Sequence, residues 1–152
     1  MLFAVGAGCT TTLDSKVQPA RQPARICQPA TEATTLVEQV LDRVNQARLA
    51  EELEPLVLDP LLSAVADDFA CQMIEDGFLA HTHPVDRLTP GERLTSAGYI
   101  YYAMGENLAA GQSSPEEVVT DWLTSEAHRA NILSPEWREV GARVINDMEF
   151  EA

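Results

Sequence analysis

The sequence lacks the signatures of several common enzyme and binding sites. It contains no Gly-x-Ser-x-Gly, no His-Glu-x-x-His, no phosphate-binding glycine loop and no Cys-x-x-Cys pair. These absences argue against two frequent hydrolase motifs, a P-loop, a zinc ribbon and a thioredoxin-like redox site. No stretch approaches the roughly 20 apolar residues that a membrane-spanning helix needs. Any chemistry must therefore come from a less common arrangement of residues.

Basic residues are also scarce. The 152 residues include 10 Lys and Arg against 24 Asp and Glu, which gives a net charge of −14 at neutral pH. Residues 1–30 hold three of the basic residues and one of the acidic ones, so residues 31–152 carry a net charge of −16. An acidic body repels phosphate backbones, and nucleic acid is not an expected partner. The length suits one domain with a tail, and 45% hydrophobic residues are enough for a core.

The chain has three cysteines, Cys9, Cys27 and Cys71, so at least one of them has no cysteine partner within the chain. Cys9 follows a short apolar run with small residues, which resembles the end of a bacterial lipoprotein signal, where the cysteine carries the lipid. The alternative is an N-terminal segment with an incidental cysteine. We expect three parts: a remnant of a lipoprotein signal in residues 1–9, a linker rich in proline and threonine in residues 10–34, and a folded domain in residues 35–152.

The periodicity of apolar residues predicts helices in the first half of the domain. One helix is expected over residues 36–47, with Thr34 or Thr35 as its cap. A second helix is expected to begin after Asp59, which caps it, and to end at Gly77.

The second half of the domain mixes short helices with strands. Residues 78–90 are expected to form a loop, and Thr89 and Ser114 each precede a proline that opens a short helix. Strands are predicted at residues 99–102 and 140–145. This order of elements indicates an α+β fold, and the pattern alone gives no specific topology.

Only three histidines are present, His81, His83 and His128. Imidazole titrates near neutral pH and is the commonest metal ligand. Two histidines with the carboxylate of Glu106 are therefore a candidate site for a divalent cation or for proton transfer. The ordinary alternative is that a histidine in a surface loop is only solvated, which is our expectation for His83.

Several segments carry a family resemblance when they are taken in order. They are Asn45-x-x-Arg48, Phe78-Leu-Ala-His81, Asp86-Arg87 through Arg93 to Ala97-Gly98-Tyr99, Gly105-Glu106-Asn107-Leu108-Ala-Ala-Gly111, Val118-Val-x-x-Trp122-Leu-x-Ser125-x-x-His128-Arg-x-Asn131-Ile-Leu133 and Glu139-Val140-Gly141. Together they resemble the bacterial branch of the CAP superfamily, which comprises cysteine-rich secretory proteins, antigen 5 and pathogenesis-related protein 1. The resemblance implies a three-layer α-β-α sandwich with a mostly antiparallel central sheet.

The resemblance also implies a site. The family has a central cleft lined by two His and two Glu, and three of these places fall on His81, Glu106 and His128. Ser125 stands where animal and plant members have the second Glu, and Glu126 beside it points elsewhere on a helix. Three ligands with a serine make a weaker cation site, for which Zn²⁺ and Ca²⁺ are the candidate cofactors.

The remaining cysteines suggest a crosslink. Cys27 and Cys71 are the candidate pair for a disulfide between the linker and the second helix, which suits an oxidising compartment. The alternative is two unpaired buried thiols.

The expected function is that of a secreted or lipid-anchored CAP-domain protein of the bacterial envelope. Its partner is expected to be a lipid, a cell-wall fragment or another protein, with membrane contact only through a lipid on Cys9. One rival is a metal-assisted hydrolase, such as a peptidase, with Glu106 as general base and His81, His83 and His128 as ligands. This rival requires His83 to turn toward His81. Another rival is a structural envelope protein with a vestigial cleft.

Overall fold

A computed structural model of the chain describes residues 2–5, 27–30 and 32–146. The elements are, in order, β1 (Leu2–Val5), β2 (Gln28–Pro29), α1 (Ala33–Ala50), β3 (Val57–Leu58), α2 (Pro60–Asp76), α3 (Pro90–Ser96), β4 (Glu106–Ala109), α4 (Pro115–Thr124), α5 (Glu126–Ile132) and β5 (Glu139–Asn146). The predicted α+β class is confirmed. Cys9 and most of the expected linker lie outside the described residues. Among the described helices, none is both long and apolar enough to cross a membrane.

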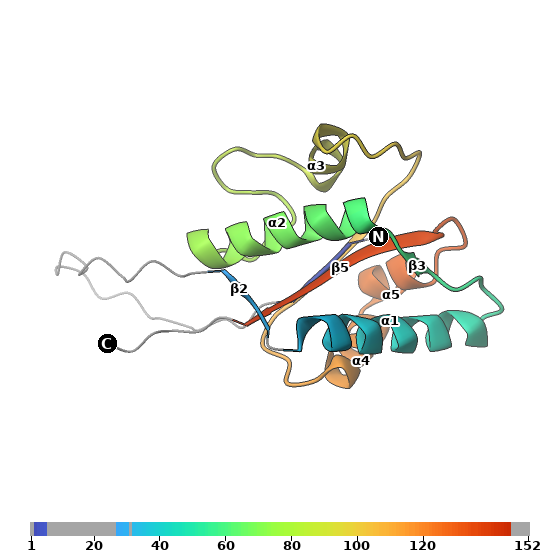
Figure 1. Cartoon of the computed structure of the whole chain (residues 1–152). Coiled ribbons are helices and arrows are strands. Elements are labelled where there is room, and N and C mark those ends of the chain that lie inside the picture. The colour runs from blue at the N-terminus through green and yellow to red at the C-terminus, as the bar shows by residue number, and fades with distance from the viewer. Residues whose placement is uncertain (1, 6–26, 31, 147–152) are drawn as a thin grey trace.

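The strands form a small sheet with helices on both of its faces (Figure 1). α2 lies on one face of β5, and α1, α4 and α5 lie on the other. α2 approaches β5 so closely that a Cβ on Gly141 would lie 2.1 Å from the backbone carbon of Leu62. The contact between this helix and this strand therefore requires glycine at position 141.

The direction of the strands differs from the expectation. The strand order is β2-β5-β1-β4, and β3 also pairs with β5. β1 runs parallel to β4 and to β5, β3 runs parallel to β5, and β2 runs antiparallel to β5. A mostly antiparallel sheet is therefore not confirmed for the described strands. Helices lie between β4 and β5 in the chain, which gives the long connection that two strands running the same way require.

The helix ends that depend on nearby residues form as predicted. Asp59 caps α2 by accepting a hydrogen bond from the backbone N–H of Leu62 at 2.8 Å. Gly77 ends the same helix with a φ of 68°, in the left-handed region that glycine tolerates. Thr89 caps α3 as predicted, and the structure adds a reciprocal bond from Glu92 that completes a capping box. These signals work because both partners lie within one turn of the chain.

Two local predictions are wrong. α1 begins at Ala33 without a side-chain cap, so the two predicted caps, Thr34 and Thr35, lie inside the helix. Residues 99–102 form no strand. Tyr99 and Tyr101 instead pack against apolar residues of α2 and α3, so their rings are covered without strand pairing.

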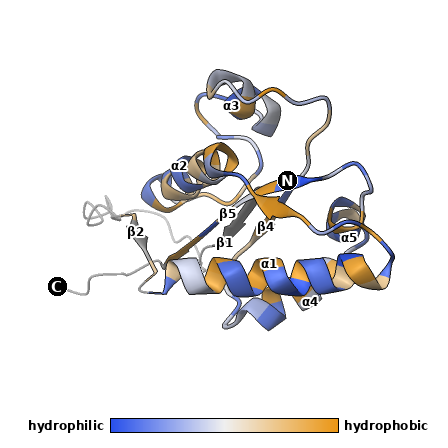
Figure 2. Ribbon diagram, turned by 45° about the vertical axis from the view of Figure 1, so that its right-hand side comes forward, coloured by the Kyte–Doolittle hydropathy of each residue, from blue (hydrophilic) through white to orange (hydrophobic). Residues whose placement is uncertain are grey.

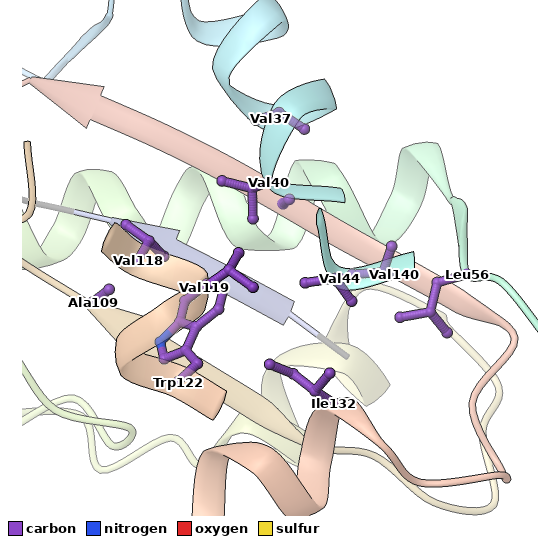
Figure 3. Close-up of a cluster of buried hydrophobic side chains, with 11 residues drawn as sticks. Val37, Val40, Val44, Leu56, Ala109, Val118, Val119, Trp122, Ile132 and Val140 are labelled. Carbon is purple, nitrogen blue, oxygen red and sulfur yellow. The ribbon is translucent and has the colours of Figure 1, made fainter. Parts of the chain in front are cut away.

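The main hydrophobic core lies between α1, α4, α5 and the sheet (Figure 3). Trp122 is 1% exposed, and its Nε1 donates to the backbone oxygen of Leu108 at 3.0 Å. Figure 2 shows hydrophobic and hydrophilic residues alternating along α1 with the spacing of one buried face. The buried residues of the core are Val37, Val40, Val44, Leu56, Ala109, Val118, Val119, Trp122, Ile132, Val140 and Ala142.

The Asn45-x-x-Arg48 segment clamps the end of α1 to two other parts of the chain. The guanidinium of Arg48 is fully buried and donates to four backbone oxygens, those of Glu54 at 2.9 Å, Ile132 at 2.6 Å, Ser134 at 2.9 Å and Trp137 at 3.3 Å. Burial, with Arg138 nearby, lowers the pKa of Arg48. The carbonyls at the end of α5 carry partial negative charge, which favours the buried cation. Asn45 bonds both the N–H and the C=O of Leu56.

The predicted disulfide between Cys27 and Cys71 is confirmed, with Cα atoms 5.1 Å apart. It ties the segment that leads into β2 to the middle of α2, across a sequence separation of 44 residues. Closing a loop of this size stabilises a fold by roughly 4 kcal/mol, because it restricts the unfolded chain.

Replacing Arg48 with Met should lower the free energy of unfolding by about 3–5 kcal/mol, because buried carbonyls lose their donors. Arg43→Met is the matched control on the same helix. Arg43 forms a surface ion pair with Glu116 at 3.3 Å, and its loss should cost less than about 1 kcal/mol. Urea denaturation of the two variants measures the difference, and equal stabilities would contradict the clamp.

Candidate functional site

Glu106 is the centre of the candidate site. It begins β4, and only 4% of its side chain is exposed. Its Oε2 accepts a hydrogen bond from Arg93 Nη2 at 2.6 Å, and its Oε1 lies 2.8 Å from His81 Nδ1. Arginine stays charged, and hydrogen bonds between a guanidinium and a carboxyl oxygen are among the strong ones in proteins. Both oxygens of Glu106 are therefore engaged within the protein.

Arg93 holds together the four elements around this carboxylate. It lies in α3, and its Nη1 donates to the backbone oxygens of His81 at 2.8 Å and Leu88 at 3.2 Å. Its guanidinium also stacks on the ring of Phe69 in α2, 3.3 Å from the ring centroid, which is a cation–π contact. One side chain thus links α2, α3, β4 and the loop that carries His81.

His81 is the exposed member of the array, with 52% of its side chain accessible. Because Glu106 Oε1 accepts, Nδ1 of a neutral His81 carries the proton and donates to it. Nε2 is then left with a lone pair, and no hydrogen-bond partner for it occurs among the described residues. The arrangement presents an oriented imidazole to solvent with a free acceptor.

His83 has a structural role, which corrects the expectation that it is solvated. Its ring is buried, lies edge-on to Phe78 with 4.8 Å between centroids, and bonds Asp76 Oδ2 through Nε2 at 3.1 Å. Its Nδ1 accepts from the backbone N–H groups of residues 85–86. Both nitrogens are engaged, and His83 does not turn toward His81 as the metal-dependent hydrolase required.

His128 is connected to the site through its backbone. It lies in α5, and its C=O accepts from Asn107 Nδ2 at 3.1 Å. Asn131, one turn later, donates to the backbone oxygen of Glu106 at 3.2 Å and to Asn107 Oδ1 at 2.9 Å. Among the described residues, no hydrogen bond joins the imidazole of His128 to His81 or Glu106. The structure therefore pairs His81 with Glu106 and brings α5 alongside β4.

The donor set does not fit a bound metal ion. Within the described part of the chain, no group of three or more His, Cys, Asp or Glu side chains is placed to hold one. Arg93 and His81 already occupy the oxygens of Glu106. Ser125 lies at the junction of α4 and α5 and supplies no carboxylate. Binding of Zn²⁺ or Ca²⁺ by His81, Glu106 and His128 stays a prediction that this geometry does not support.

Sequence analysis missed two residues that build the site, Arg93 and Asn131. Both lie in segments that carry the family resemblance, but their partners are 12 to 25 residues away in the chain. The only local feature that marks Arg93 is that it precedes the apolar Leu94 on a predicted short helix. That signal does not distinguish a buried arginine from an exposed one.

Replacing Arg93 with Met should lower the free energy of unfolding by about 3–5 kcal/mol, because Glu106 is left as an unpaired buried charge. Adding Glu106→Gln to this variant should restore part of the loss, because that charge is then gone. Urea denaturation of the single and double variants gives the coupling energy. Arg87→Met, at an exposed position in the loop that leads into α3, is the control. If the double variant loses the sum of the two single losses in free energy of unfolding, Arg93 and Glu106 are not coupled.

Comparison with known proteins agrees with this fold. The model of the CAP family, the cysteine-rich secretory protein family, matches residues 41–149. The Bacillus subtilis protein YkwD is 36% identical over 108 residues, which cover 71% of this chain and 42% of that protein. The chain thus spans less than half the length of this relative.

Solved structures give the same result. An extracellular protein containing an SCP domain from Bacillus anthracis has a TM-score of 0.67 at 28% identity, over 72% of this chain and 36% of that one. An outer surface protein from Borrelia burgdorferi has a TM-score of 0.60 at 22% identity, over 77% of this chain and 84% of that one, a likeness in fold. Since the family model covers most of the chain, the protein belongs to the CAP family of cysteine-rich secretory proteins.

Proposed function

We propose that this chain is an extracellular or cell-surface protein of a bacterium that binds a ligand through the exposed imidazole of His81. The observation that carries the proposal is the array of His81, Glu106 and Arg93. Arg93 fixes the carboxylate, the carboxylate fixes the ring, and the ring leaves its Nε2 open to solvent. An exposed polar group held in one orientation is what a binding site needs, because little freedom remains to be lost on binding.

The location rests on the relatives and on the disulfide. The Bacillus anthracis relative is an extracellular protein, and the Borrelia burgdorferi structure is an outer surface protein. The bond between Cys27 and Cys71 suits an oxidising compartment. A lipid on Cys9 is part of the proposal as the means of attachment to the membrane.

The geometry favours a ligand that donates a hydrogen bond. Nε2 of His81 accepts in the tautomer that Glu106 selects, so a hydroxyl or an amide N–H is the matching group. Apolar side chains of the same loop are exposed nearby in the sequence, Leu79, Val85 and Leu88. The acidic body disfavours anionic ligands. A lipid with a neutral hydroxyl, the sugar of a cell-wall fragment and a protein segment all meet these conditions.

A catalytic role is the second candidate, and the orientation of His81 favours it. A histidine whose Nδ1–H bonds a carboxylate is arranged to accept a proton at Nε2 from a bound hydroxyl or water. In this version His81 is the base, and Glu106 only orients it. The version with His83 as a metal ligand does not agree with the contacts of that residue.

Co-sedimentation tests the proposed binding. The full chain is incubated with purified cell-wall sacculi, or with vesicles of uncharged lipid, and the pellet is assayed for protein. We expect binding to one of the two, its loss in His81→Ala and its retention in His128→Ala. Equal binding by all three proteins, or binding by none of them, would sink the proposal.

The full chain should bind neither Zn²⁺ nor Ca²⁺ tightly, because the oxygens of Glu106 are already bonded and His81 offers one nitrogen. Isothermal titration calorimetry checks this, with His81→Ala and His128→Ala alongside. A binding heat that disappears in both variants would show that the two histidines share a metal ion after all.

A further inference from the structure

The space between β4 and β5 is filled by β1. β1 pairs with β4 from Leu2↔Glu106 to Val5↔Ala109, and with β5 from Leu2↔Gly141 to Val5↔Val144. Four residues near the N-terminus are thus the link between the two strands. Without them, β4 and β5 would be separated by the width of one strand.

The backbone N–H and C=O groups of the odd-numbered residues of β5 point toward β1. The N–H of Val57 donates to the oxygen of Arg138, and the N–H of Asp59 donates to the oxygen of Val140. Even-numbered residues of β5 therefore face β3. Because alternate residues of a strand face opposite neighbours, Gly141 and Arg143 face β1.

The backbone N–H and C=O groups of the odd-numbered residues of β4 also point toward β1. On the far side of β4, the oxygen of Glu106 accepts from Asn131 Nδ2 and the oxygen of Leu108 accepts from Trp122 Nε1. These side chains cover the outer edge of the sheet, which leaves Asn107 and Ala109 to face β1. β4 therefore has one edge closed by side chains and one edge that needs a strand.

The open edges lie in the core. With β1 in place, the residues that face it are buried: Asn107 fully, Ala109 nearly so, and Gly141 as well. The backbone N–H and C=O groups on these two edges have β1 as their partner, and leaving such groups unpaired is unfavourable, which favours retention of the strand. The strand that fills it ends four residues before Cys9 and is separated from Cys27 by a long segment of chain.

We propose that the groove between β4 and β5 is a strand-acceptor site. It takes an extended apolar segment in parallel register, here Leu2–Val5, and it takes the same segment when that segment is a separate peptide. Recognition is through main-chain hydrogen bonds on both sides, the mode in which a sheet accepts an added strand. The groove shares Glu106 with the candidate site, because Glu106 pairs with Leu2 through its backbone and holds His81 through its side chain, but recognition of the strand uses main-chain groups alone.

Nicking the folded chain tests the proposal. A sequence for a site-specific protease is inserted between Leu13 and Asp14, and the folded protein is cut. We expect the N-terminal fragment to stay with the body through gel filtration, and a labelled peptide of residues 1–8 to exchange into its place. Loss of the fragment on cutting, with or without unfolding of the body, would overturn the proposal.

A single substitution tests the pairing of β1 with β4 and β5 without cutting the chain. Ala4 pairs with Leu108 and Arg143, and Ala4→Pro removes its backbone N–H. Amide hydrogen exchange at residues 107, 109, 141 and 143 should then rise about ten-fold or more. Ala4→Val keeps the N–H and should leave exchange unchanged. Equal exchange in the two variants would show that residues 2–5 do not fill the groove.

Discussion

The ion pair between Arg93 and Glu106 is the interaction on which the candidate site depends. Arg93 acts on His81 twice, directly at its backbone oxygen and indirectly through the carboxylate that holds its ring. The same guanidinium rests on Phe69 of α2. The position of the loop, the position of the carboxylate and the orientation of the imidazole therefore have one common cause. A site built this way cannot lose its arginine and keep its geometry.

The three histidines show how neighbours decide the role of identical side chains. His81 and His83 are two residues apart in one loop, yet the first is half exposed and the second is buried with both nitrogens bonded. His128 contributes its carbonyl to the contact between α5 and β4. The sequence shows which histidines are candidates for a site. Their contacts in the folded chain determine which of them is available to a ligand.

The parts of the fold that sequence could predict are those with partners close in the chain. The cap at Asp59 and the box at Thr89 follow from residues within one turn. The pairing of Cys27 with Cys71 was a candidate in the sequence, with two unpaired thiols as the alternative, and the structure confirms it. The parallel strands, the burial of His83 and the role of Arg93 depend on residues brought together from distant segments. Local periodicity carries no information on such contacts, and the family resemblance supplied the site residues without their bonds.

Arg48 has a consequence for how this chain can change over evolutionary time. Its partners are main-chain oxygens, which every amino acid possesses, so the clamp does not depend on which side chains occupy the segment from Ile132 to Trp137. Substitutions there can accumulate without weakening it, whereas an insertion or deletion would move the oxygens out of reach. Relatives of this protein should therefore keep the length of that segment, and the buried Ile132 within it, while its exposed positions, such as 135 and 136, vary.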